Sequence, residues 1–286
     1  MRTRRQITAI LASLLALTPL TACGTHPAQP NSILSSRITV GIVTDAEGFD
    51  TGDLKPSGFD IDVMNTLGTQ LKAQMVPTLT TYADRESDLL SGRTDLVIAT
   101  YSITPQRNHA GIDFAGPYMV SPQALLVRAD NNKIAKKDDL KGKTVCAVEG
   151  STAAETNIPG ATATLEQTTH DCVGQLNQGN TDAVFTNSLI LSSYTHASPN
   201  KYKVVLPGVF GEIQYLGVGL KSGHHADCET IDRILSNFLN TQWTQDFAAQ
   251  FPGEAAAYSG SDTSQGNFAS VFKPTVDDMS RLSCKL

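Results

Sequence analysis

The pattern of apolar positions along the chain predicts strands and helices together. The unbroken apolar run over 96–99 is typical of a strand that is buried on both faces of a parallel sheet. Apolar residues at positions 59, 63, 67 and 71 recur at the spacing of one buried helix face. The same spacing predicts an amphipathic helix over 231–239 and another from Trp243 to Phe251. Further strands are expected over 38–43, 74–81, 120–127, 144–148, 182–188 and 214–220.

Polar residues follow the apolar run over 96–99 and predict a binding site for a carboxylate. Thr104 followed by a proline is a helix-start signal, so Arg107 lies in a first helical turn. The helix dipole is already positive there, and an anion beside Arg107 would explain its position. The hydroxyls of Thr100 and Ser102, free N–H groups and the guanidinium would together hold a carboxylate at the carboxyl end of the strand. The alternative is an ordinary ion pair between Arg107 and a neighbouring acid.

A second turn of this kind follows the strand expected over 144–148. It contains Gly150, Ser151 and Thr152, and the spacing from Thr152 to Glu155 is that of a capping box at a helix start. N–H groups and hydroxyls again point beyond the carboxyl end of a strand. Because the turn lacks the glycine run and the lysine of a nucleotide phosphate loop, a small anion is the expected ligand.

Composition limits the classes of partner. The chain has 286 residues, 40% of them hydrophobic and 17% charged, which are globular values and enough length for two lobes. Its formal net charge is −6, and becomes −9 without the three arginines at positions 2, 4 and 5. Such an acidic balance argues against nucleic acid as a partner. The sequence has no Cys/His cluster with metal-ligand spacing and no Ser-His-Asp pattern, so no metal, cofactor or catalytic residue is expected.

The N-terminal region predicts export and attachment to a membrane. Residues 1–22 combine basic positions with an apolar run too short to span a bilayer, which is the pattern of a signal peptide. The run ends in Leu-Thr-Ala-Cys, which matches the lipobox of bacterial lipoproteins, so Cys23 is the expected lipid attachment site at the extracellular face of the cell membrane. Residues 23–36 are expected to form a flexible linker. The alternative is an ordinary secretory leader with a chance cysteine.

Four further cysteines indicate an oxidising compartment, because an even number remains once Cys23 carries the lipid. Pairing Cys146 with Cys172 and Cys228 with Cys284 keeps both disulfides local. The sequence itself permits three connectivities.

Two segments resemble a known family. The stretch over 95–119, with its T-P-x-R turn, is similar to the ligand-binding segment of bacterial extracellular solute-binding proteins, family 3, which feed polar amino acids to ABC importers. Gly-Phe-Asp at 58–60 matches the opening of the family's first helix, and Asp60 and Asp62 are interpreted as first-turn carboxylates that favour the helix dipole. The resemblance implies an α/β, two-lobed, periplasmic-binding-protein-like type II fold, each lobe a mostly parallel sheet flanked by helices, with two crossover strands between the lobes. Lobe 1 is expected over 37–127 and 221–286, and lobe 2 over 128–220.

The resemblance also implies which residues hold a carboxylate. Thr100, Ser102 and Arg107 correspond to the family's contacts with the α-carboxylate of the ligand. The Gly-Ser-Thr turn, with Ser151 and Thr152, corresponds to the contact from the opposite lobe.

Two residues before this segment imply the remaining contacts. Tyr82 corresponds to the aromatic residue on which the family stacks the aliphatic part of its ligand. Arg85 corresponds to the arginine that reaches the side-chain carboxylate in members that bind acidic amino acids. Two guanidiniums that face one pocket repel each other, so a ligand with two carboxylates would relieve the repulsion. The alternative for Arg85 is a surface charge paired with Asp84 or Asp88.

Asn187 departs from the family pattern, in which an aspartate usually neutralises the α-ammonium of the ligand. Loss of the charge weakens this contact by about 1 kcal/mol. Asp45 or Glu47 could supply the missing anion, or the ligand lacks an amine. The structural alternative is an asparagine that only caps the helix through Tyr194.

The resemblance implies a lipid-anchored extracellular receptor that binds a polar, acidic amino acid and delivers it to an ABC permease in the membrane. Glutamate and aspartate are the expected ligands, with glutamine and asparagine as further candidates, and the protein is expected to be a monomer and not an enzyme. One alternative is a ligand sensor for a membrane signalling partner. The other is a dehydratase or wall-cleaving enzyme on the same fold, for which Glu149 is the only candidate acid or base.

Overall fold

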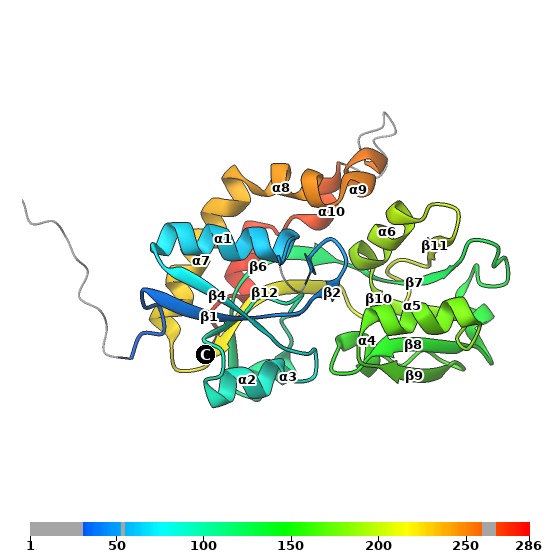
Figure 1. Cartoon of the computed structure of the whole chain (residues 1–286), viewed down its shortest axis with the longest axis horizontal. Coiled ribbons are helices and arrows are strands. Elements are labelled where there is room, and N and C mark those ends of the chain that lie inside the picture. The colour runs from blue at the N-terminus through cyan, green and yellow to red at the C-terminus, as the bar shows by residue number, and fades with distance from the viewer. Residues whose placement is uncertain (1–30, 53–54, 259–266) are drawn as a thin grey trace, which may run out of the picture. The chain divides into compact units, whose positions relative to one another are not determined.

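The computed structural model describes residues 31–52, 55–258 and 267–286, and two five-stranded sheets form its framework (Figure 1). The first sheet has the order β4-β1-β5-β12-β6, with β1 (Arg37–Ile42), β4 (Gln74–Leu79), β5 (Leu96–Val97), β6 (Ile112–Ser121) and β12 (Gln214–Lys221). The second has the order β11-β7-β10-β8-β9, with β7 (Gln123–Arg128), β8 (Thr144–Val148), β9 (Thr162–Glu166), β10 (Ala183–Asn187) and β11 (Tyr202–Val205). The predictions for residues 1–22 and for Cys23 lie outside the described ranges.

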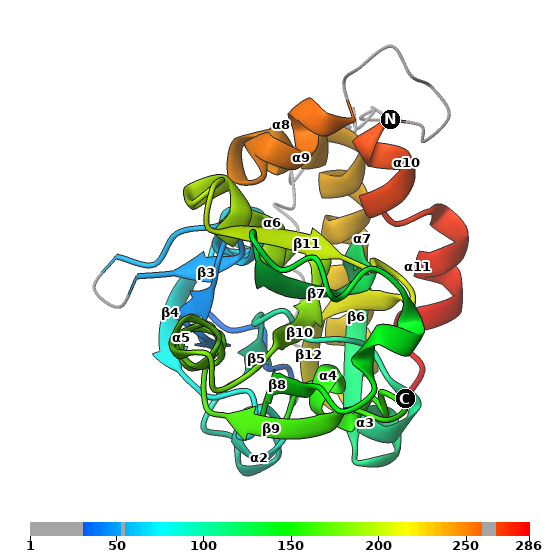
Figure 2. The same ribbon diagram turned by 90° about the vertical axis from the view of Figure 1, so that its right-hand side faces the viewer.

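Parallel and antiparallel pairs occur in both sheets. β1 is parallel to both of its neighbours, and so is β8. β12 and β7 are antiparallel to both of theirs. β9 forms an edge of the second sheet, at the bottom of the view in Figure 2. The expected α/β class with two sheets is therefore confirmed, and both sheets are mixed rather than mostly parallel.

The polypeptide passes between the two sheets twice. β6 ends at Ser121 in the first sheet and β7 begins at Gln123 in the second, so the single strand expected over 120–127 is wrong. Pro122 lies between them and has no N–H group to donate to a strand ladder, which favours an interruption there. The chain returns between β11 and β12. The lobe boundaries at 127/128 and 220/221 stay predictions, although β7 belongs to the second sheet and β12 to the first.

Helices cover both faces of the first sheet. They are α1 (Phe59–Leu71), α2 (Arg85–Ser91), α3 (Pro105–His109), α7 (His225–Thr241) and α8 (Trp243–Gln250). In Figure 1, α1 lies above the strands and α2 and α3 lie below them. The α1 helix buries Phe59, Val63 and Leu67, as its periodicity predicts, and the Phe59 ring centroid lies 5.8 Å from that of Phe238 on α7 and 6.1 Å from that of Trp243 on α8. In the described part of the chain, no helix is long and apolar enough to cross a membrane.

Shorter helices accompany the second sheet. They are η1 (Lys137–Leu140), α4 (Thr152–Glu155), α5 (Thr169–Gln178) and α6 (Ser188–Ala197). A disulfide joins Cys146 on β8 to Cys172 on α5, within an apolar cluster that includes Leu126 and Leu176. A two-stranded hairpin of β2 (Asp45–Ala46) and β3 (Asp50–Thr51) precedes α1, and its Asp45 reaches the start of α5.

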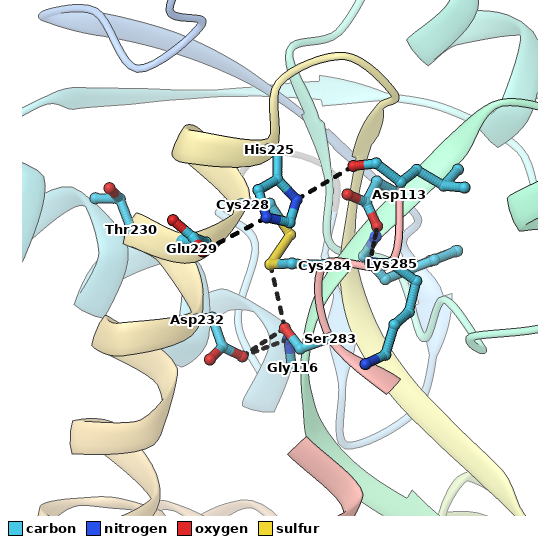
Figure 3. The surroundings of a disulfide bond; sticks show 12 residues. Asp113, Gly116, His225, Cys228, Glu229, Thr230, Asp232, Ser283, Cys284 and Lys285 are labelled. Carbon is cyan, nitrogen blue, oxygen red and sulfur yellow. Dashed lines mark hydrogen bonds and ion pairs between the residues drawn. A yellow bond between two sulfur atoms is a disulfide. The ribbon is translucent and has the colours of Figure 1, made fainter. Parts of the chain in front are cut away.

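The C-terminal segment folds back onto β6. It contains α9 (Pro252–Ala257), α10 (Phe268–Phe272) and α11 (Val276–Leu282). Beyond α11 the Cys284 N–H donates to the Phe114 carbonyl at 2.7 Å and the Lys285 N–H to Asp113 Oδ1 at 2.9 Å. Figure 3 shows the disulfide between Cys228 on α7 and Cys284 that holds this segment. Both disulfides therefore have the local pairing among the three that the sequence permits.

Candidate functional site

Arg85 at the start of α2 is a buried residue that, among the residues described, donates only to backbone carbonyls. Its side chain is inaccessible, with 1% relative exposure. Nε donates to the Tyr82 carbonyl at 3.1 Å, Nη1 to the Ala99 carbonyl at 2.9 Å and Nη2 to the Gly150 carbonyl at 3.0 Å. The alternative of a surface charge paired with Asp84 or Asp88 is therefore wrong, because the helix turns Arg85 inward between the sheets.

Arg107 on α3 is buried beside Arg85 and combines an ion pair with backbone contacts. The Thr104 hydroxyl accepts from the Arg107 N–H at 3.3 Å, so the expected helix start is confirmed. Nε pairs with Glu86 Oε1 at 2.8 Å, Nη1 donates to the Ser102 carbonyl at 2.7 Å, and Nη2 donates to the Gly150 carbonyl at 3.3 Å. The ion pair with a neighbouring acid, which was the alternative interpretation of Arg107, is therefore made with Glu86. Glu86 occupies one edge of the guanidinium, and another edge faces the second sheet.

The two guanidiniums lie against the same aromatic ring. The Cζ atoms of Arg85 and Arg107 are each 4.6 Å from the Tyr101 ring centroid, and Arg85 is also 4.9 Å from that of Tyr82. Burial, and then the positive charge of Arg107, lower the pKa of Arg85 to about 10. Two like charges in a desolvated place repel each other, so this region favours an anion.

Gly150 is the point at which the second sheet meets the arginines. It has a φ of 74°, and a Cβ atom there would lie 2.5 Å from Ala83 Cα. Real Cβ atoms do not approach a backbone atom so closely, so a glycine is required for the contact. The Gly150 oxygen can therefore reach both Nη2 atoms.

The hydroxyls after Gly150 are already bonded to the protein. Ser151 caps α4: its hydroxyl donates to the Val148 carbonyl at 2.6 Å and accepts from the Ala154 N–H at 3.2 Å. The predicted helix start is right, but the cap is Ser151 rather than Thr152. The Thr152 hydroxyl donates to Gln214 Oε1 at 2.7 Å and accepts from Gln123 Nε2 at 3.2 Å. Both hydroxyls would have to exchange a partner to contact a ligand.

Three predicted contact residues have a side-chain polar group without a protein partner in the described part of the chain, and that of Tyr82 is fully buried. Ser102 and Asn187 are 3% and 6% exposed, and within the described ranges neither side chain makes a hydrogen bond. The Tyr82 hydroxyl is buried without a partner in the same part of the chain. Asn187 precedes α6 but its side chain forms no cap bond, so the alternative of a purely capping asparagine is wrong. An unpaired buried hydroxyl such as that of Tyr82 is costly, and the Ser102 and Asn187 side chains are available to bond a ligand.

Asp45 bonds to the start of helix α5, which accompanies the second sheet. Its Oδ2 accepts from the Thr169 N–H at 2.7 Å, and burial raises its pKa. Glu47 lines a separate pocket between α6 and α9, together with His196 and Glu254. Asp45 is therefore engaged and Glu47 lies in a different pocket, so neither acid replaces the missing aspartate of the family in this arrangement.

A pocket of about 350 Å³ opens between the start of α3 and the start of α4. Its lining includes Thr104 on one side and Thr152 on the other, with Gln214 between them. Segments that accompany both sheets therefore border one hollow, although neither Arg85 nor Arg107 is among its lining residues. Within the ranges described, no three His, Cys, Asp or Glu side chains are grouped as metal ligands would be.

Sequence reasoning missed Glu86 and Tyr101, which hold the arginines, and Gln123 and Gln214, which hold Thr152. An acid one residue after Arg85 and an aromatic residue between Thr100 and Ser102 were the only signals available.

Comparisons with known proteins show the family to which the chain belongs. Residues 38–250 match the family described as bacterial extracellular solute-binding proteins, family 3. The chain is 34% identical over 254 residues to the glutamate-binding protein GluB of Corynebacterium glutamicum, covering 82% of this chain and 86% of the relative. It is 32% identical over 269 residues to GluB of Corynebacterium efficiens, covering 87% and 91%. Among solved structures it is similar to an ancestral amino-acid-binding protein described as a precursor of cyclohexadienyl dehydratase, with a TM-score of 0.69 and 25% identity, covering 76% of this chain and 96% of that chain.

The chain belongs to the bacterial extracellular solute-binding proteins, family 3. The expected family is therefore confirmed, and with it the class of an extracellular solute-binding protein. The family and both GluB relatives are described as binding proteins and not as enzymes.

Proposed function

We propose that this chain binds an acidic α-amino acid, glutamate or aspartate, between its two sheets. The observation that carries the proposal is the convergence of two buried guanidiniums, Arg85 and Arg107, on the single carbonyl oxygen of Gly150. A hydrogen bond with one ionised partner is roughly twice as strong as a neutral one, and a carboxylate adds a charge–charge attraction to arginine that a carbonyl lacks. A ligand carboxylate in place of the Gly150 oxygen would therefore satisfy both arginines better than the protein does by itself.

The charge balance favours a ligand with a second carboxylate. Arg107 pairs with Glu86, whereas in the described part of the chain the hydrogen bonds of Arg85 end on carbonyl oxygens. An α-carboxylate on Arg107 leaves Arg85 for the side-chain carboxylate, as in the family pattern. The Ser102 hydroxyl would join Arg107 on the α-carboxylate, and the Asn187 amide would face the amino group. The names of the two GluB relatives support glutamate.

A panel of ligands tests this assignment. Thermal and calorimetric titrations would compare glutamate, aspartate, glutamine, asparagine, arginine and succinate. A ligand at a thousand times its dissociation constant adds about 4 kcal/mol to the free energy of unfolding. We expect glutamate or aspartate to bind most tightly. A preference for arginine, or no binding of any amino acid, would contradict the proposal.

The proposed location and partner follow from the N-terminal pattern and the family. We propose that a lipid on Cys23 holds the receptor at the extracellular face of the membrane, where it delivers its ligand to an ABC permease. Metabolic labelling with palmitate should mark the wild-type chain and not Cys23→Ser. Uptake of radioactive glutamate in cells without the gene should fall, and should return only with the binding-competent chain.

One observation weighs against the catalytic alternative. Glu149, the acid or base considered for it, is exposed and its Oε2 accepts from Gln167 Nε2 at 2.6 Å. It therefore does not face the arginines as a buried general acid would. Incubation of the protein with each bound amino acid, followed by NMR, should show unchanged ligand, and any turnover would favour an enzyme.

A further inference from the structure

Asp60 on α1 is a fully buried carboxylate that bonds to a predicted ligand residue. Oδ2 accepts from the Thr100 N–H at 2.6 Å, and Oδ1 accepts from the Tyr118 hydroxyl at 2.8 Å. Tyr118 is fixed in turn, because its carbonyl accepts from Trp243 Nε1 at 2.9 Å. Asp60 is the second residue of α1, yet these bonds are with distant segments and not with its own helix turn. The interpretation as a simple dipole-stabilising acid therefore leaves its contacts unexplained.

The Thr100 backbone is in a conformation that needs support. Its φ is 46°, in the left-handed region that β-branched residues rarely adopt. On one side of the turn, the Asp60 carboxylate accepts a hydrogen bond from the Thr100 N–H. From the other side Arg85 Nη1 donates to the Ala99 carbonyl at 2.9 Å and to the Thr100 carbonyl at 3.5 Å. The turn is thus held between a carboxylate and a guanidinium.

The surroundings of Asp60 make its role depend on charge. Burial raises its pKa to about 6, whereas the bonds from Tyr118 and Thr100 and the charge of Arg85 act in the opposite direction. A second buried acid, Asp50, lies near enough to repel it. A carboxylate in such a place persists only with partners of the kind it has here.

We propose that Asp60 is a positioning residue of the ligand site, whose carboxylate holds the Ala99–Thr100 turn in its left-handed form and so aligns Arg85 and Thr100 for the ligand. The Gly-Phe-Asp opening of α1 is then part of the recognition machinery, although it touches no ligand. This inference rests on the proposed amino acid binding.

The test compares two isosteric substitutions on the same helix turn. Asp60→Asn keeps the shape and removes the charge, and Asp62→Asn is the matched control, because Asp62 bonds only Gln250 at 2.7 Å. Calorimetry with L-glutamate should show binding weakened about tenfold in Asp60→Asn, as expected for the loss of one hydrogen bond to a charged group. The control should stay within about twofold of wild type, since its bond is remote from the site. Amide exchange at Thr100 should be faster in Asp60→Asn.

A double substitution separates positioning from general stability. Glycine adopts a positive φ without strain, so Thr100→Gly removes the need for support at this turn. If Asp60 acts by positioning, adding Asp60→Asn to Thr100→Gly should weaken binding much less than adding it to wild type. A purely structural role for Asp60 would give the same loss in both backgrounds, and would overturn the proposal.

The outcomes also distinguish this proposal from the proposed function. Wild type that binds no amino acid would overturn the function. Wild type that binds glutamate while Asp60→Asn binds equally well would overturn only the positioning role. If Asp60→Asn does not fold, Tyr118→Phe removes a single bond to the same carboxylate, and it should weaken binding in the same direction. If Tyr118→Phe changes neither the affinity for L-glutamate nor the rate of amide hydrogen exchange at Thr100, the proposal is contradicted.

Discussion

Arg85 and Arg107 donate from their Nη2 atoms to one oxygen, the carbonyl of Gly150, over 3.0 and 3.3 Å. The arginines belong to segments beside the first sheet and Gly150 follows β8 of the second, so this oxygen joins the two halves of the site. A neutral carbonyl between two guanidiniums is a weaker partner than a carboxylate. Without a ligand, the two guanidiniums connect the halves of the site through the Gly150 carbonyl. A ligand carboxylate would bond the same two guanidiniums more strongly.

The close approach of Gly150 predicts the effect of adding one methyl group. Gly150→Ala would place Cβ 2.5 Å from Ala83 Cα, which forces the second sheet away from the arginines. We expect glutamate binding to weaken at least tenfold, because even a small displacement disturbs hydrogen bonds to charged groups. Calorimetry measures the affinity, and fluorescence energy transfer between labels on β4 and β9 measures the separation of the sheets.

Gly142→Ala is the matched control for this substitution. Gly142 has a similar φ of 72°, but a Cβ atom there meets nothing within 4 Å. Both variants should lose about 1 kcal/mol of folding stability through backbone strain. Only Gly150→Ala should change the separation of the sheets. Equal ligand affinities in the two variants would contradict a role for the contact.

The two arginines predict different losses. Arg85→Gln should reduce the preference for glutamate over glutamine, because its guanidinium is proposed to hold the side-chain carboxylate. Arg107→Gln should weaken the binding of both ligands, because the α-carboxylate is common to them. The surface residue Arg93, whose partner is Asp88, provides the control Arg93→Gln. Titrations with both ligands measure these effects, and an unchanged preference in Arg85→Gln would remove the reason for expecting an acidic ligand.

Asn187 predicts a gain of affinity on restoring a charge. Asn187→Asp places a carboxylate where the family usually has one, and should tighten binding of α-amino acids about fivefold, which corresponds to about 1 kcal/mol. Asn177→Asp, an exposed position on α5, is the control for the added charge. Isothermal titration calorimetry with glutamate measures the affinities of both variants. Weaker binding in Asn187→Asp would indicate that the ammonium group is held elsewhere.

Asp50 predicts a pH dependence of stability. Burial, and then the charges of Asp60 and Asp45, raise the pKa of Asp50 to about 9 against a smaller opposing effect of the Val43 backbone, and within the described ranges the Asp50 carboxylate has no hydrogen bond of normal geometry. A carboxyl with a raised pKa in the folded state favours folding at low pH, and this contribution is lost as pH rises from about 4 to about 9. Asp60, with its pKa raised to about 6, acts in the same direction up to that pH. Wild type should therefore be less stable at pH 8 than at pH 5.

Asp50→Asn should remove most of this slope. A shift of one pKa unit corresponds to about 1.4 kcal/mol. The free energy of unfolding of Asp50→Asn, relative to that of wild type, should therefore increase by at least this amount between pH 5 and pH 8. Urea unfolding at both pH values measures the difference. Asp130→Asn, at an exposed position, should leave the slope as in wild type. Parallel pH profiles for wild type and Asp50→Asn would show that another group carries the dependence.

Local patterns determined a large part of the fold. The face of α1 with Phe59, Val63 and Leu67 and the cap at Thr104 follow from spacing and side-chain chemistry within a few residues. The strand over 120–127 was misjudged, because an apolar run does not show that its two ends join different sheets. The resemblance to a family supplied the candidate site, and both guanidiniums do lie together.

Only the tertiary structure decided what each site residue contacts. The partners of Arg85 and Thr100 lie 65 and 40 residues away in the chain, on Gly150 and Asp60. Thr152 is held by Gln123 and Gln214 rather than left free. The sequence by itself determined which chemical groups are available, the buried face of α1 and the cap at Thr104, because those depend on neighbours along the chain. Which groups meet depends on how two sheets are brought together, and periodicity carries no information about contacts over such separations.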